Sequence, residues 1–164
     1  MRRIAVRLAK LLGARVIATT GRHDKEARLR ALGADDVVDY RTTPDRAAAV
    51  RDLTGGRGAD RIVGTGGAPD RSFAAIALSG QIALVGSCSG AWPSIDTGRL
   101  LGAAATLRTL AVGSRAQFLA MNDLITEHGL RPVIDRTFGF EEAAAAYRYY
   151  ESADPFGNVV IEMR

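Results

Sequence analysis

The sequence is poor in the residue types that build disulfides and metal sites. Its 164 residues include one cysteine, Cys88, and two histidines, His23 and His128. A single cysteine excludes an internal disulfide, and this set is too small for a conventional zinc site, so no zinc is expected in this chain. Cys88 has no candidate base near it and is expected to line the core or a pocket.

Long apolar runs and basic runs are missing as well. No window reaches the roughly 18 uncharged apolar residues of a membrane-spanning helix, and the N-terminus lacks the apolar core of a signal peptide. These absences predict a cytoplasmic chain without a membrane partner. The lysines and arginines are scattered along the chain, so no nucleic-acid partner is expected.

What the sequence does contain is an ordinary globular composition with a modest positive charge. Hydrophobic residues make up 47%, charged residues 24%, and the formal net charge is +4. The length fits one domain with a continuous core. A positive excess in such a domain suits an anionic cofactor.

Helix and strand signals alternate through the first two-thirds of the chain. Helices are expected at Ala5–Leu12, Asp24–Leu32, Pro44–Leu53, Asp70–Leu78 and Ile95–Ala104. Strands are expected at Arg15–Thr19, Asp36–Asp39, Arg61–Val63, Gln81–Val85 and Thr106–Val112. This alternation predicts an α/β fold with a parallel, doubly wound sheet.

The last third has a different pattern. Ser114 and Gln117 form a capping-box pattern at the start of a helix that Gly129 closes. The apolar face of this helix consists of Phe118, Met121, Leu124 and Ile125. A strand, a helix and a final strand are expected at Arg131–Phe138, Glu141–Glu151 and Asn158–Ile161.

Glycine-containing turns follow several of the predicted strands, at the sheet edge where open α/β folds bind ligands. Glycines there let a dinucleotide approach the backbone and leave N–H groups free to donate to it. The residues concerned are Thr20, Gly21, Arg22, Gly66, Gly67, Gly86, Ser87, Val112 and Gly113. Each glycine taken alone is also explained by a plain turn.

The segment RIVGTGGAPDR has glycines between a strand and a helix, as a dinucleotide fingerprint does. However, Pro69 stands at the third glycine position, and no acidic residue ends a strand about 20 residues later. A methyltransferase that uses Gly64–Gly67 for its cofactor is an alternative, although QIALVGS lacks the acidic residue that such an enzyme predicts.

The end of RVIATTGRHDK bears on the choice of cofactor. A carboxylate there binds the ribose hydroxyls of NAD, whereas cationic or small polar residues suit the 2′-phosphate of NADP. Thr20-Gly21-Arg22 followed by Lys25 therefore favours NADP(H) over NAD. Asp24 is expected to cap the next helix. Solvated surface charges are the alternative for Arg22 and Lys25.

Three segments resemble the C-terminal half of medium-chain dehydrogenases/reductases, especially zinc-type alcohol dehydrogenase-like and NADPH:quinone oxidoreductase-like members. They are LAKLLGARVIATTGRHDKEARLRALGADDVVDYR, TGGRGADRIV and the block from VGSR to FGNVVI. The resemblance implies a Rossmann-like domain, a dinucleotide cofactor and hydride transfer in the family. It also implies that Gly21, Lys25 and Tyr40 hold the adenosine 2′-phosphate, with Arg22 as an added cation.

The resemblance implies further contacts along the nicotinamide half of the cofactor. Gly66, Gly67, Gly86 and Ser87 match loops beside the nicotinamide ribose, and Val112 and Gly113 match positions beside the carboxamide. The segment Thr106–Val112 matches an edge strand through which two subunits commonly join, so a homodimer is expected. Tyr40 is equally compatible with a strand-end aromatic that covers the core.

Several family parts find no match in this sequence. They are the GroES-like catalytic domain with its zinc ligands, the first Rossmann strand and the glycine-rich pyrophosphate turn. Residues 1–164 are therefore expected to form one truncated domain that lacks this strand and turn, and 114–164 would return to the missing domain. Asn158 also replaces the family's usual lysine.

These departures have expected consequences. The strands RVIAT and RIV flank the missing strand, and direct pairing is the expected closure of the gap. In the alternatives, another polypeptide supplies a strand, or the chain alone is only marginally stable. Arg2 and Arg3 would contact phosphate only loosely, so weak NADPH binding and no catalysis by the chain alone are expected. A non-catalytic nucleotide-binding or dimerisation module is the alternative function.

Overall fold

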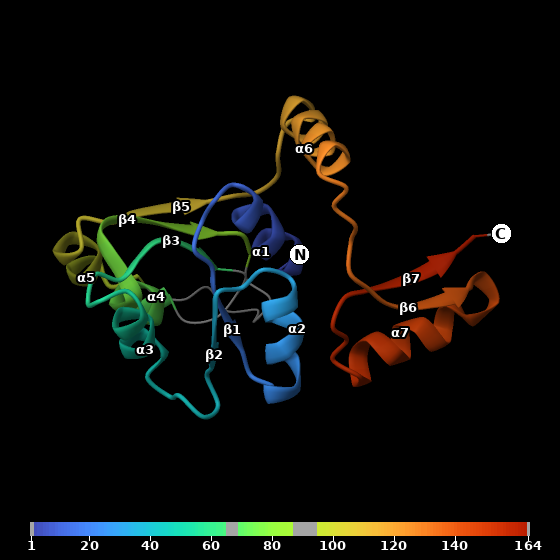
Figure 1. Ribbon diagram of the computed structural model, residues 1–164, viewed down its shortest axis with the longest axis horizontal. Helices are drawn as coiled ribbons and strands as arrows, with labels where there is room; N and C mark the ends of the chain where they lie inside the picture. The colour runs from blue at the N-terminus through green and yellow to red at the C-terminus, as the bar shows by residue number, and fades with distance from the viewer. Residues whose placement is uncertain (1, 65–68, 87–94, 164) are drawn as a thin grey trace.

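The computed structural model describes residues 2–64, 69–86 and 95–163, and it is an α/β protein (Figure 1). The helices are α1 Arg2–Leu11, α2 Glu26–Ala31, α3 Arg46–Leu53, α4 Pro69–Ala75, α5 Thr97–Gly102, α6 Arg115–Glu127 and α7 Ala143–Ser152, with 3₁₀ turns η1 His23–Lys25 and η2 Phe140–Glu142. The strands are β1 Ile17–Thr20, β2 Asp36–Asp39, β3 Ala59–Gly64, β4 Ile76–Leu84, β5 Thr106–Thr109, β6 Ile134–Gly139 and β7 Asn158–Glu162. The predicted alternation of helices and strands is confirmed.

The described strands form three parallel sheets. β1 pairs with β2, β4 lies between β3 and β5, and β6 pairs with β7. Within the described residues β1 does not pair with β3, so the expectation that these two strands close the gap directly is wrong. Ile17 of β1 and Ile62 of β3 both pack against the cluster of Ala47, Val50 and Ala75. Both strands therefore pack against residues of α3 and α4 without pairing with each other.

The strand β4 begins earlier than the sequence indicates. The helix expected to reach Leu78 ends at Ala75, and Ile76 pairs with Ala59 at the start of the ladder. Ile76 and Ala77 are buried, and Ser79 has a left-handed φ of 60°. This backbone forms a bulge before Gln81 resumes the pairing with Arg61. Burial in the sheet outweighs the helix preference of Ala75–Leu78.

The other boundaries shift by a few residues. β5 ends at Thr109 rather than Val112, and only the backbone N–H of Leu110 still donates to Leu84 across the sheet, at 2.9 Å. Helix α3 begins after Asp45, whose carboxylate accepts the N–H of Ala48, and not at Pro44. The homodimer through the β5 edge stays a prediction.

Helix α6 has the predicted cap but no buried face. The Ser114 hydroxyl accepts the Gln117 N–H, and the Gln117 side chain accepts the Ser114 N–H, as the sequence pattern indicates. Figure 1 shows this helix standing apart from the other helices, and Phe118 and Met121 on its apolar face are exposed. Among the described helices none is long and apolar enough to cross a membrane.

Two further apolar clusters hold the helices and strands together. Phe73, Ile76 and Ile82 fill the space between α4 and the β3–β5 sheet. Ala18, Leu29, Ala34 and Phe156 form a second cluster. Because Phe156 precedes β7 while Ala18 lies in β1, this cluster joins the two ends of the chain.

Candidate cofactor site

The site lies where β1 and β2 end side by side. The N–H of Tyr40, just after β2, donates to the carbonyl of Thr20 at 2.9 Å, and Thr20 itself is buried. A Cβ on Gly21 would overlap the phenol group of Tyr40. Glycine at position 21 therefore allows the Tyr40 ring to lie directly over the turn that follows β1.

Arg22 is held close to the turn by two polar contacts. Its N–H donates to the Thr20 hydroxyl at 3.1 Å, and its guanidinium forms a bidentate pair with Asp24, at 2.8 and 2.7 Å. The hydrogen bond from Arg22 lowers the pKa of Asp24 and raises that of Arg22. The expected helix cap by Asp24 is wrong, because no side chain caps η1 and the guanidinium takes the carboxylate instead.

Lys25 is the least exposed cation of the site. Its side chain is 11% exposed, and its Nζ donates to the backbone carbonyl of Asp154 at 2.8 Å and to the Asp154 carboxylate. The alternative of a solvated surface charge is therefore wrong for Lys25, whereas Arg22 is substantially exposed. The ammonium group lies at the carboxyl end of β1 with an anion against it.

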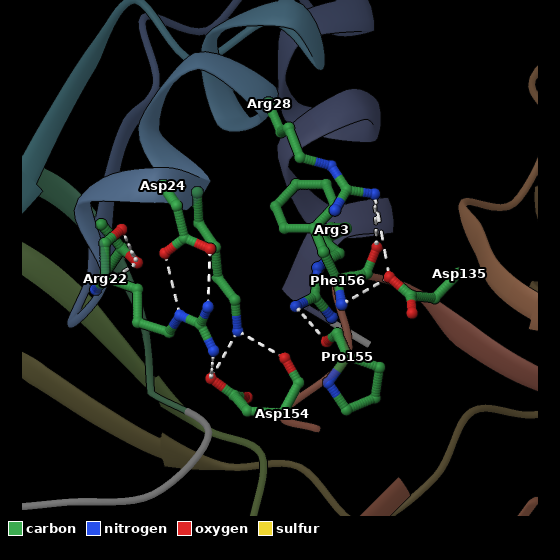
Figure 2. A network of polar contacts seen from close by, with 10 residues as sticks. Arg3, Arg22, Asp24, Arg28, Asp135, Asp154, Pro155 and Phe156 are labelled. Carbon is green, nitrogen blue, oxygen red and sulfur yellow. Dashed lines mark hydrogen bonds and ion pairs between the residues drawn. The ribbon is translucent and has the colours of Figure 1, made fainter. Parts of the chain in front are cut away.

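The segment that carries Asp154 is anchored by aromatic and polar contacts (Figure 2). The Phe156 ring is buried, with the guanidinium carbons of Arg3 and Arg28 at 4.5 and 4.0 Å from its centroid. Arg3 also donates to the carbonyl of Pro155 at 3.0 Å. Arg3, expected near the cofactor's phosphates, thus binds the chain's own C-terminal part.

Asp135 completes the anchor from β6. Its carboxylate is 10% exposed and accepts hydrogen bonds from the Tyr149 hydroxyl at 2.7 Å and the Phe156 N–H at 2.8 Å. The Tyr149 hydrogen bond is the main cause that lowers the pKa of Asp135, and the same contact raises the pKa of Tyr149. The charged form of Asp135 therefore stabilises the fold.

The variant Asp135→Asn is expected to lower the free energy of unfolding at pH 7 by about 1–3 kcal/mol, because hydrogen bonds to a charged acceptor are lost. A lowered folded pKa gives stability that is present above the unfolded value near 3.9 and is lost as pH falls through the folded value. The acid side of the stability curve should therefore flatten in this variant. Urea denaturation at a series of pH values measures both effects.

The matched control for this prediction is Asp60→Asn. Arg57 lowers the pKa of Asp60 in the same direction, but both side chains are exposed, so little change in stability is expected. Equal acid sensitivity of the wild type and Asp135→Asn would contradict the stabilising role of Asp135.

Among the described residues, Gly86, Val112 and Gly113 are not gathered at this position. Gly86 follows β4 and is exposed, and Gly113 precedes α6 with the Gln117 side chain beside it. Val112 is 95% exposed and lies beyond the end of β5. Gly66, Gly67, Ser87 and Cys88 lie outside the described residues. The nicotinamide contacts that the resemblance implies therefore stay predictions.

One group of possible metal ligands lies beside the turn. One ligand atom each from His23, Glu26 and Asp39 come within 4.8 Å of one another. Glu26 already faces His23 Nδ1 at 3.4 Å, and Asp39 accepts the Arg41 N–H at 2.9 Å. These contacts explain why the three side chains lie close together. They do not test the expectation of no zinc in this chain, which stays a prediction.

Comparison with protein families identifies the domain. The model of the zinc-binding dehydrogenase family matches residues 3–127. This chain belongs to that family. A zinc-type alcohol dehydrogenase-like protein of Schizosaccharomyces pombe is 30% identical over 165 aligned positions, covering 97% of this chain and 48% of the relative. The chain thus spans about half the length of the curated relatives it matches.

Solved structures of this dehydrogenase family confirm the fold. The crystal structure of an NAD-dependent alcohol dehydrogenase superposes with a TM-score of 0.89 at 36% identity, covering 99% of this chain and 48% of that one. A mycobacterial protein in complex with NADPH superposes with a TM-score of 0.81 at 30% identity, covering 98% of this chain and 54% of that one. The domain is a Rossmann-like, NAD(P)-binding domain of the dehydrogenase type.

Sequence reasoning missed the C-terminal half of the site. Asp154 contacts Lys25 across a separation of 129 residues, and Asp135 and Phe156 contact Arg28 from comparable distances along the chain. The only local signal was Asp154-Pro155, which indicates a turn and not a partner. Hydrogen-bond and packing partners at this separation follow from the tertiary fold alone.

Proposed function

We propose that this chain binds NADP(H) for an oxidoreductase of the alcohol dehydrogenase or quinone reductase type, with the adenosine 2′-phosphate beside Lys25. The observation that carries the proposal is a buried ammonium group at the carboxyl end of β1 that already has an anion against it. Parallel α/β sheets bind their ligands at this edge. A relative solved with NADPH and membership of a dehydrogenase family support it.

The residues at the turn fit a phosphate group. Lys25 supplies N–H donors and a positive charge, and Arg22 supplies a second cation that is exposed enough to turn toward a ligand. Gly21 lets the Tyr40 hydroxyl lie over the turn, where it is available as a donor. β1 ends with Thr20 and not with an acidic residue. A carboxylate at this point is the group that NAD-specific domains use to bind the ribose hydroxyls.

In this role the chain's own residues bind and orient the cofactor. Lys25 and Arg22 would neutralise the phosphate, and Tyr40 would fix the adenosine end against the β1–β2 edge. The bound cofactor supplies the hydride. That residues 114–164 return to a catalytic domain, and that the isolated chain does not catalyse, stay predictions.

Replacing Lys25 with alanine is expected to weaken NADPH binding about tenfold, because a charge-assisted hydrogen bond contributes about 1.5–3 kcal/mol. NADH carries a hydroxyl at the same position, so its dissociation constant should change by less than about twofold. Titration of the cofactor's fluorescence with wild-type protein and Lys25→Ala measures both constants.

Lys10→Ala is the matched control, because Lys10 pairs with Asp35 on a different surface. It should leave both dissociation constants unchanged. Equal weakening of NADPH and NADH in Lys25→Ala, or no NADPH binding to the wild type at millimolar concentration, would overturn the proposed position of the 2′-phosphate.

A further inference from the structure

We propose that Asp154 is a built-in competitor of the cofactor's 2′-phosphate and reduces the preference of this domain for NADPH over NADH. The inference rests on the proposed function. It assigns to a residue of the C-terminal segment a specificity-determining role at the turn after β1, which neither the family match nor the relatives' names assign.

The carboxylate of Asp154 stands at the anion position of this site. Its Oδ2 atom pairs with Lys25 Nζ and lies 4.0 Å from a terminal nitrogen of Arg22. Figure 2 shows the Arg22 guanidinium between the carboxylates of Asp24 and Asp154. Since Lys25 and Arg22 are the same two cations that would face a 2′-phosphate, the carboxylate and the phosphate compete for one place.

The pocket around this ion pair is small and polar. It has a volume of about 150 Å³. Its charged lining residues are Arg22, Asp24, Lys25, Arg28, Asp135 and Asp154. A phosphate that enters such a space next to Lys25 meets the negative charge of Asp154 at short range, which disfavours binding.

The backbone around Asp154 is anchored, whereas its side chain is largely exposed. Asp154 has a left-handed φ of 43°, and the next two residues are held by Arg3, Arg28 and Asp135. The side chain itself is 68% exposed. Rotation about its side-chain bonds would remove the carboxylate from Lys25, while the hydrogen bond from Lys25 Nζ to the Asp154 carbonyl remains. Displacement of the carboxylate by a phosphate is therefore a local step that does not require the segment to unfold.

The charge of each cofactor determines how much Asp154 weakens its binding. A 2′-phosphate carries a charge of about −1.5 to −2 and must displace the Asp154 carboxylate to bind Lys25. NADH has neutral hydroxyl groups there, and these donate to a carboxylate without displacing it. Asp154 therefore opposes NADPH and tolerates NADH, while Lys25 and Arg22 favour NADPH.

The test is the variant Asp154→Asn, in which the charge is removed and the left-handed backbone is still tolerated. NADPH should bind about 3–10-fold more tightly than to the wild type, because one solvent-screened like charge that competes for Lys25 is removed, and the NADH dissociation constant should change by less than about twofold. Asp123→Asn, on α6, is the control and should change neither constant. Asp154→Gly, which also suits a positive φ, is expected to repeat the result if the asparagine variant folds poorly.

The outcomes separate this inference from the proposed function. If Lys25→Ala loses NADPH selectively while Asp154→Asn and Asp154→Gly bind it no more tightly, the competitor role is wrong and the proposed function stands. If 2′,5′-ADP binds neither the wild type nor the Asp154 variants at millimolar concentration, both are wrong. Tighter 2′,5′-ADP binding with unchanged 5′-AMP binding in the Asp154 variants supports both.

Discussion

The variant Phe156→Ala is expected to lower the free energy of unfolding by about 3–5 kcal/mol, the range for a buried phenylalanine reduced to alanine. Phe156 is 3% exposed and belongs to the cluster with Ala18, Leu29 and Ala34. The guanidinium groups of Arg3 and Arg28 stack on its ring, so their contacts are lost as well. Urea denaturation followed by circular dichroism measures the change.

The variant should also change the cofactor site, because the Phe156 ring anchors the segment that carries Asp154. Loss of the anchor is expected to reduce the protection of amides in 153–157 from hydrogen exchange before the whole fold opens. Phe140→Ala is the matched control, since Phe140 is 56% exposed and should cost little stability. Similar losses in the two variants would show that Phe156 does not join the two ends of the chain.

The variant Ile82→Ala is expected to cost about 2–5 kcal/mol, because it opens a cavity in the centre of the β3–β5 sheet. Ile82 is 0% exposed and pairs with Ile62 on one side and Leu107 on the other. Phe73 and Ile76 cover it from α4 and the start of β4.

A graded series makes this prediction sharper. Ile82→Val removes one methylene and should cost about 0.5–1.5 kcal/mol. Ile134→Ala, in β6, is the same substitution at a position that is 51% exposed, so its cost should fall well below that of Ile82→Ala. Midpoints of urea denaturation that fail to rank in this order would contradict the placement of Ile82 at the centre of the core.

The local elements follow from the sequence because their causes are local. The side chains of Ser114 and Gln117 each accept a hydrogen bond from the other's backbone N–H within one turn. The start of α6 can therefore be predicted from four residues. Gly13 ends α1 with a left-handed φ of 79°, as a glycine after a helix indicates. Each of these interactions joins positions only a few residues apart, and neighbours in the chain meet whatever the rest of the fold does.

Two expectations are wrong because another partner outweighs the local preference. Ile76–Leu78 follows the helix-favouring residues Ala74 and Ala75, yet pairing with β3 makes it the start of β4. Asp24 has the residue type and place of a helix cap, yet the neighbouring guanidinium binds it. In both cases a tertiary or side-chain partner contributes more than the local preference it replaces.

By itself the sequence determined the α/β class, the family resemblance and the cationic turn after β1, because spacing and residue type carry that information. The tertiary structure alone decided that Lys25 is buried, that Asp154 lies against it and that Phe156 holds Asp154 in place. Charge balance at the site depends on a carboxylate 129 positions from its partner. Such a contact depends on the packing of Phe156 with Ala18 and Leu29, and no periodicity along the chain encodes it.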